Sequence, residues 1–373
     1  MSNKGNPNTH PVLQTEQMRK FQELLPDEYV DQRWNAENVE FAVGPVEPNP
    51  EALADKSRRT LHRREREPNG KRFPFPVPNG WFAVAESRDL TPGDVQSHHL
   101  FGKDVVLYRS DSGEARMIDA YCPHLGAHIG CGGKVEGDGI RCPFHAWRYD
   151  GATGRCTDIP YTKQERIPTR AKVRTYPVVE RNKMVWAWHH LEEKDPFYEV
   201  SEWPEFSDPE WLPYEIKTFE LATCVQEMAE NDADYVHFTY VHGSAPIEDG
   251  EQIVDGAYKR SANGIFIREN FGLGCTLLRL GDVFRFASSV VPIDEENVRV
   301  VWWFTGPRSS GEDAARIIAE AFFSGVSQDL QIWENKRYQP RPVLVKEEAR
   351  IAEHRKWASQ FYSGVTPQTL AND

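Results

Sequence analysis

Three cysteines and three histidines lie within CPHLGAHIGCGGKVEGDGIRCPFHAW, residues 122–147. Cys122 and His124 form a C-x-H pair, seventeen residues intervene, and Cys142 and His145 form a C-x-x-H pair. Thiolates bind iron–sulfur clusters, and imidazoles that replace two thiolates on one iron raise the reduction potential. The two mixed pairs therefore predict a [2Fe-2S] cluster with both cysteines on one iron and both histidines on the other.

A zinc site is the main alternative for the same four residues, because zinc also accepts two cysteines and two histidines. Common zinc motifs pair cysteine with cysteine and histidine with histidine, whereas each pair here is mixed and contains a proline, Pro123 or Pro143. This difference favours the cluster. The remaining His128, Cys131 and Cys156 are interpreted as loop or core residues.

A second group of possible ligands occurs in EMAENDADYVHFTYVHG, residues 227–243. Glu230, Asp234 and His237 are spaced i, i+4 and i+7, which places them on one face of a helix. His242 follows His237 by five residues, or about 140° on a regular helix. The helix must therefore distort or end between the two histidines if both bind one metal. Two histidines and one carboxylate with open positions are typical of non-haem Fe(II) oxygenases.

A distant carboxylate could complete this set. An apolar helical stripe near the C-terminus contains a single acid, Asp329, and an unpaired buried charge is costly. Iron is one possible partner and an arginine is the alternative; Asp282, Asp294 and Glu320 are the other candidate ligands. The stripe consists of Ile318, Phe322, Val326, Asp329 and Trp333.

The elements that must position these residues predict two domains. Short strand-like runs separated by Gly, Pro and Asp predict a small antiparallel β domain over residues 76–195. Further strands and a helix at about 312–337 predict an α+β domain over residues 196–373, with helices covering an antiparallel sheet. Residues 1–75 are polar and arginine-rich and predict a helical extension, with helices at 15–25 and from residue 51 to the Pro68-Asn69-Gly70 turn.

Bulk properties narrow the class of protein. The 373 residues suffice for two cores, and the formal net charge of −13 argues against a nucleic-acid partner. We find no apolar run long enough to span a bilayer and no signal peptide at the start, which predicts a cytoplasmic protein. Without an export signal, the six cysteines are read as ligands and buried thiols. No GxGxxG fingerprint follows a strand, which argues against a nicotinamide- or flavin-binding domain in this chain.

The cluster motif, including Trp147 two residues after its last ligand, resembles the Rieske family. Ala127 and Phe144 stand where respiratory Rieske proteins carry a disulfide, so the chain resembles the oxygenase and ferredoxin branch. With the second motif, residues from 76 onward resemble Rieske non-haem iron oxygenases. The stretches CPFHAW, ERIPTR, WAW and SQDLQIWENK look most like the 3-ketosteroid 9α-hydroxylase and related sterol oxygenases.

This resemblance implies roles for the second group of residues. It implies that His237, His242 and Asp329 bind a mononuclear Fe(II) ion. It also implies that Asp234 carries electrons across a subunit boundary, by a hydrogen bond to His145 of the partner subunit. Glu230 falls where the family places a further acid or amide near the iron.

The resemblance further implies a terminal oxygenase with an all-β Rieske domain and an α+β catalytic domain. Such a monooxygenase uses O2 and electrons from NAD(P)H, delivered by a separate reductase with or without a ferredoxin, to hydroxylate an apolar substrate such as a steroid or sterol. It forms a homotrimer, because electrons pass head to tail between subunits. The alternatives are an oxidative O-demethylase or ring hydroxylase of an aromatic compound, and a Rieske electron carrier without catalysis.

Overall fold

The computed structural model describes residues 23–24, 48–54, 71–163, 166–243 and 250–372. The chain divides into two compact units: residues 77–202 with 291–295, and residues 1–76, 203–290 and 296–373. We call the first the β unit and the second, which contains the predicted catalytic domain, the catalytic unit. Most of the predicted helix at 15–25 and most of the predicted arginine-rich helix lie outside the described residues. The described part of the arginine-rich helix is α3 (Pro50–Ala54).

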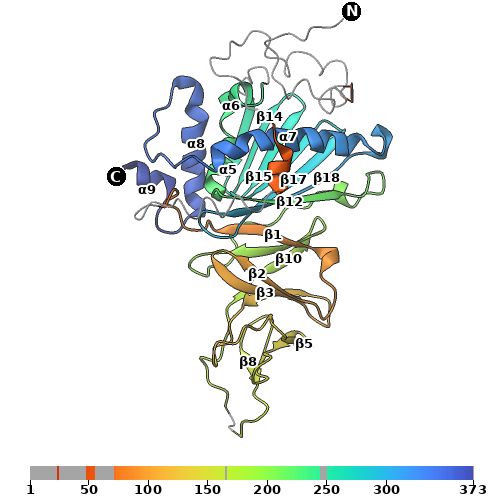
Figure 1. Ribbon diagram of the computed structural model, residues 1–373, viewed down its shortest axis with the longest axis vertical. Helices are drawn as coiled ribbons and strands as arrows, with labels where there is room; N and C mark the ends of the chain where they lie inside the picture. The colour runs from red at the N-terminus through yellow and green to blue at the C-terminus, as the bar shows by residue number, and fades with distance from the viewer. Residues whose placement is uncertain (1–22, 25–47, 55–70, 164–165, 244–249, 373) are drawn as a thin grey trace, which may run out of the picture. The chain divides into compact units, whose positions relative to one another are not determined.

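The β unit consists of three small antiparallel sheets, which confirms the predicted all-β domain (Figure 1). In spatial order they contain β1 (Gly80–Glu86), β11 (Met184–His189) and β10 (Val178–Arg181); β2 (Val95–Leu100), β3 (Lys103–Arg109), β4 (Ala115–Asp119) and β9 (Thr175–Tyr176); and β5 (Lys134–Glu136), β6 (Gly139–Arg141), β7 (Arg148–Tyr149) and β8 (Cys156–Asp158).

The third of these sheets is built around the cluster motif. The run IRCPFHAWRYD reads as one strand in the sequence, but β6 ends at Arg141 and β7 begins at Arg148. The loop between them carries Cys142 and His145, because a ligand loop must leave the sheet ladder to face a cofactor. Tyr108, Ile129, Ile140 and Tyr149 are completely buried beneath the loops and form part of the core on which they rest.

The catalytic unit is built on a seven-stranded sheet, and its antiparallel pairing confirms the predicted antiparallel sheet. Sequence patterns indicated most of its strands but missed β13 and β14, because β13 is a largely exposed edge strand without apolar alternation. The spatial order is β12 (Glu215–Leu221), β18 (Val298–Thr305), β17 (Phe284–Pro292), β16 (Cys275–Leu280), β15 (Phe266–Phe271), β14 (Tyr258–Asn263) and β13 (Glu251–Asp255).

Helices cover this sheet, and the long helix α7 lies across its strands (Figure 1). Ile318, Asp329 and Trp333 of the predicted stripe are buried on α7, which also contacts β12 and β18. The segment predicted as one helix at 225–243 is instead two short helices. The helices are α5 (Val225–Asn231), α6 (Tyr235–Tyr240), α7 (Ala314–Trp333), α8 (Ala349–Ala358) and α9 (Pro367–Asn372).

Candidate metal centres

The four predicted cluster ligands lie on two loops with the same backbone pattern. In each loop the cysteine N–H donates to the carbonyl five residues later, at 2.9 Å for Cys122 and 2.8 Å for Cys142. The residue four positions after each cysteine donates back to its carbonyl and has a positive φ, 75° at Gly126 and 57° at Ala146. An alanine in this conformation costs about 1 kcal/mol, so the surrounding fold must hold the second loop in this shape.

The cysteines and the histidines of the cluster motif have different surroundings. Cys122 and Cys142 are each only 3% exposed, whereas both histidine rings are partly exposed, with their centroids 4.7 Å apart. Trp147 stacks on His124 at 4.4 Å with nearly parallel planes. The arrangement places the sulfur ligands inside the unit and the imidazole edges at its surface.

Hydrogen bonding and burial act on the two thiols. The phenol oxygen of Tyr149 lies 3.0 Å from the sulfur of Cys122, and burial together with this cysteine raises the pKa of Tyr149. The phenol therefore stays protonated and can donate to a Cys122 thiolate. Burial also raises the pKa of Cys142, so metal binding must stabilise its thiolate form.

The geometry of the four residues fits a two-iron cluster better than a single zinc ion. Ligand atoms of a zinc site lie about 2.0–2.3 Å from the metal, and therefore within about 4 Å of one another. Among the described residues, the group of three or more possible ligands whose atoms lie within 4.8 Å of one another is His237, His242 and Asp329. The cysteines and histidines of the cluster motif do not converge on one point in this way.

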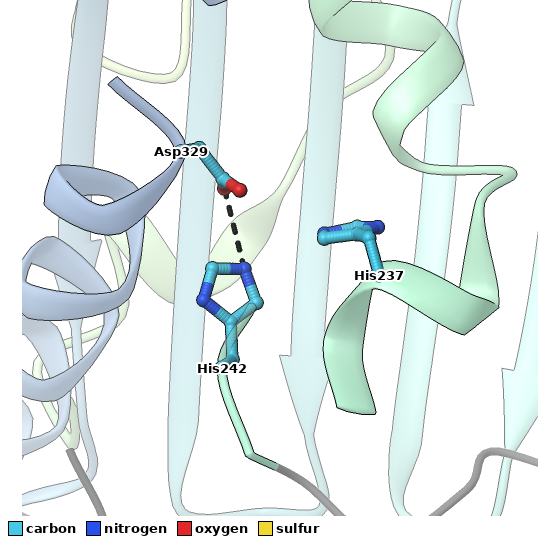
Figure 2. A group of neighbouring side chains, drawn as sticks. All are labelled: His237, His242 and Asp329. Atoms are coloured by element: carbon cyan, nitrogen blue, oxygen red, sulfur yellow. Dashed lines mark ion pairs between the residues drawn. The ribbon is translucent and has the colours of Figure 1, made fainter. Parts of the chain in front are cut away.

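The predicted mononuclear site combines three chain segments in the catalytic unit (Figure 2). His237 lies on α6, His242 follows the end of α6, and Asp329 projects from α7. The Nε2 atom of His242 is 3.3 Å from Oδ2 of Asp329. The exposed fractions of the three side chains are 10%, 15% and 6%, in the order named, so the ligand atoms are largely shielded from water.

Asp329 is thus paired with a histidine rather than with the arginine considered as its alternative partner. Two other candidate ligands lie elsewhere: the side chain of Asp282 is fully exposed, and Glu320 pairs with Lys217 at 2.5 Å. The buried acid at position 329 is therefore the carboxylate that the structure places beside the histidines.

Hydrogen bonds orient both imidazoles toward the same point. Nδ1 of His237 donates to the backbone carbonyl of Asp234 at 2.5 Å, and Nδ1 of His242 donates to the side-chain oxygen of Gln328 at 3.0 Å. Because each Nδ1 carries the proton, each Nε2 keeps a lone pair for a metal. The donor set and its tautomers fit a divalent iron ion.

Electrostatics distinguishes the two histidines. Burial lowers the pKa of His237. Burial also disfavours the charged form of His242, but the Asp329 carboxylate and hydrogen bonds to Asp329 and Gln328 outweigh it, so the pKa of His242 is raised. A proton and a metal ion therefore compete for the electrons of the His242–Asp329 pair.

Asp234 and Glu230 do not share one helical face, because the helix breaks between them. Asp234 is the N-cap of α6 and accepts a hydrogen bond from the N–H of His237 at 3.2 Å. Its side chain is 35% exposed, so its carboxylate is partly accessible to solvent. Glu230 is buried on α5 and accepts two 2.8 Å hydrogen bonds from Arg355 of α8.

Two residues beside the mononuclear site were not predicted. Asn231 places its amide nitrogen 3.1 Å from Nε2 of His237. Gln328 orients His242 and also donates to the carbonyl of Val241 at 2.9 Å. Both were missed because amide side chains carry no charge and follow no periodic pattern here. The one feature of the sequence that could have indicated Gln328 is its position next to Asp329.

Comparisons with known proteins cover both units. The family model for the Rieske [2Fe-2S] domain matches residues 80–177. The model for the 3-ketosteroid 9alpha-hydroxylase C-terminal domain matches residues 187–264 and 282–362. The four predicted cluster ligands fall within the first match, and the three residues of the predicted mononuclear site fall within the second.

Curated relatives align along most of the chain. A cholesterol 7-desaturase of Xenopus laevis is 31% identical over 90% of this chain and 83% of its own length, and one of Bombyx mori is 33% identical over 83% and 75%. A probable 3-ketosteroid-9-alpha-monooxygenase oxygenase component of Rhodococcus rhodochrous is 28% identical over 77% and 80%.

Solved structures show the same fold. NdmA of Pseudomonas putida CBB5 superimposes with a TM-score of 0.60 at 18% identity, over 74% of this chain and 88% of that one. Dicamba monooxygenase bound to dicamba superimposes with a TM-score of 0.58 at 17% identity, over 80% of this chain and 99% of that one. In the described part of the chain, none of the helices is long and apolar enough to span a bilayer.

Three observations indicate the same family. They are the cluster loops, the match to the Rieske domain that contains them, and the long alignments to the curated relatives. This chain is an enzyme of the Rieske oxygenase family and belongs to the branch that includes the cholesterol 7-desaturases and the 3-ketosteroid 9α-monooxygenase oxygenase components.

Proposed function

We propose that this chain is the terminal oxygenase of a system that oxidises a sterol or steroid, by hydroxylation or by the related desaturation. The observation that carries the proposal is the convergence of His237, His242 and Asp329 within 4.8 Å, inside the stretch that matches the ketosteroid hydroxylase C-terminal domain. The sterol-related names of the aligned relatives support the substrate class.

In this proposal the two histidines and Asp329 hold a mononuclear Fe(II) ion, which supplies the activation of O2 when it is bound. The carbonyl of Asp234 and the amide of Gln328 fix the imidazoles. The burial of the three side chains limits access of bulk water, and exclusion of water reduces side reactions during an oxidation.

Electrons reach this site from the cluster in a neighbouring copy of the chain. The cap residue Asp234 is exposed enough to accept a hydrogen bond from the cluster histidine His145 of the partner subunit. Large apolar side chains surround the cluster loops and would be covered in a homotrimer; they are Tyr121, Leu125, Phe144 and Tyr161, between 53% and 66% exposed. A separate NAD(P)H-dependent reductase, with or without a ferredoxin, supplies electrons to the cluster.

The test is turnover of the purified chain with a Rieske reductase and NADH. Cholesterol, 3-ketosteroids and methoxybenzoates are compared as substrates, with product analysis by mass spectrometry. We expect a hydroxylated or desaturated sterol or steroid. Conversion of the methoxybenzoates with no sterol product would favour the aromatic demethylase instead.

A metal count separates an oxygenase from an electron carrier. An oxygenase holds about three irons per chain, two in the cluster and one at the mononuclear site. A chain that binds only the cluster iron, under conditions where the cluster is complete, would contradict the proposed mononuclear centre.

A further inference from the structure

Residues 232–234 form the joint between α5 and α6. The joint determines where α6, which carries His237, begins. Asp232 in this joint is tied to strand β15 at three points. Its carboxylate lies 3.2 Å from Nη1 of Arg268 and accepts a hydrogen bond from the amide of Asn270 at 3.2 Å. The same guanidinium nitrogen donates to the backbone carbonyl of Asp232 at 3.3 Å.

Arg268 also contacts α6 itself. Its guanidinium carbon lies 5.9 Å from the centre of the Phe238 ring. That ring lies 4.2 Å from the His237 ring and 5.7 Å from the His242 ring. One side chain on the sheet thus contacts both the joint that precedes α6 and the aromatic ring that packs against both histidines.

The sheet end of this connection is rigid. Asn270 is 2% exposed and its amide also donates to Thr276 on the neighbouring strand β16 at 2.9 Å. Arg268 and Asn270 are two positions apart on β15, so their side chains lie on the same face. The joint therefore rests on a fixed two-point support rather than on a single mobile arginine.

An ion pair of this exposure contributes little to global stability. The side chains of Asp232 and Arg268 are each 22% exposed, and solvent screens such pairs. Its contacts, in contrast, all lead to the segment that carries His237 and His242. Metal ligands misplaced by an ångström bind and react less well.

We propose that Arg268 is a positioning residue of the mononuclear site, acting through Asp232 and Phe238 without contacting the metal. The inference rests on the proposed iron site. Loss of Arg268 would free the start of α6 to shift, so that His237 leaves the point shared with His242 and Asp329, while the sheet and the β unit stay intact.

The experiment compares Arg268→Gln with a matched control, Arg299→Gln. Arg299 pairs with Glu220 at 3.2 Å between two strands of the same sheet, and the two side chains are 26% and 19% exposed. Full-length protein with its cluster is freed of mononuclear metal and titrated with Co(II), whose visible absorption reports coordination. The cluster spectrum serves as the internal control for folding.

We expect Arg268→Gln to weaken Co(II) binding about tenfold, by analogy with the loss of groups that orient metal ligands, and to change the Co(II) absorption. Asp232→Asn, which keeps the shape but loses the charge, should weaken it less, and Arg268→Lys should restore part of the affinity. Arg299→Gln should bind as the wild type does.

Equal Co(II) affinity and absorption in Arg268→Gln and Arg299→Gln would overturn the inference. Should Arg268→Gln fail to fold, Asp232→Asn tests the same inference by the same measurement, and wild-type Co(II) affinity and absorption in that variant would overturn it. His237→Ala distinguishes the two proposals: if it binds Co(II) as tightly as the wild type, the iron site itself is wrong. If His237→Ala loses Co(II) while Arg268→Gln does not, only the role of Arg268 fails.

Discussion

The two candidate metal-binding regions of the chain differ in how far apart in sequence their proposed ligands are and in how much water reaches them. The proposed cluster ligands occupy two short loops within residues 122–145, with buried cysteines and partly exposed histidines. The proposed mononuclear ligands come from α6, its C-terminal end and α7, and all three side chains are 15% exposed or less.

This difference matches two kinds of chemistry. An electron can leave through imidazole edges at a surface, so the cluster needs rigid loops but no enclosed space. Oxidation of an unactivated substrate needs a site shielded from water, which only elements from different parts of a folded domain can enclose. A substitution should therefore affect one centre and leave the other unchanged, except where electrons pass between them.

The largest effect is expected for the ligands of the buried site. His237→Ala or His242→Ala should remove the mononuclear iron and lower turnover about a thousandfold or more, since a metal ion stabilises a transition state by several kcal/mol. The visible spectrum of the cluster should not change. Iron analysis and visible spectroscopy on one sample test this, and full mononuclear iron in either variant would exclude that histidine as a ligand.

Asp329→Ala should have a similar effect, because it removes the carboxylate 3.3 Å from Nε2 of His242. Asp282→Ala is the matched control, since its exposed side chain lies outside the site. Normal iron binding in Asp329→Ala would show that the buried acid is not the third ligand and that another carboxylate, such as Asp294, must be tested.

Asp234 tests the one proposed link between the two regions. Asp234→Asn should keep both metals and the α6 cap, because asparagine caps as well as aspartate, yet turnover should fall about a hundredfold. Asp234→Ala should in addition lower the free energy of unfolding by about 1 kcal/mol, because the cap of α6 is missing. Single-turnover reoxidation of the pre-reduced cluster is the measurement, and a wild-type rate in Asp234→Asn would leave the residue no role in electron transfer.

His145→Cys should change only the exposed centre. A thiolate is a stronger donor than an imidazole, so the potential of the cluster should fall by on the order of 100 mV, with no change in mononuclear iron. Redox titration followed by EPR measures the shift. An unaltered potential and spectrum would contradict the assignment of His145 as a cluster ligand.

The smallest effect is expected at Tyr149, whose hydroxyl lies 3.0 Å from the sulfur of Cys122. Loss of this hydrogen bond in Tyr149→Phe should lower the potential by about 20–60 mV, the one-electron equivalent of roughly 0.5–1.5 kcal/mol. Tyr108→Phe is a control in the same core, since its hydroxyl donates to the carbonyl of Asp138. Equal shifts in both variants would mean that the sulfur contact does not tune the cluster.

The amino-acid sequence by itself determined the family and the cluster motif. The cluster could be predicted because its loops close on themselves: each cysteine N–H bonds a carbonyl five residues later. Such local geometry is encoded by spacing. Most strands of the catalytic sheet could be predicted for a similar reason, since apolar alternation over a few residues is a local signal; β13 and β14 lack it and were missed.

Only the tertiary structure showed how the mononuclear site is assembled. Spacing suggested one helix through Glu230, Asp234 and His237, but Asp234 instead caps a second helix, and Arg355 binds Glu230 from 125 positions away. Gln328 likewise orients His242 across 86 positions. Contacts of this kind depend on how α7 and α8 pack on the sheet, and helix periodicity within one segment carries no information about them.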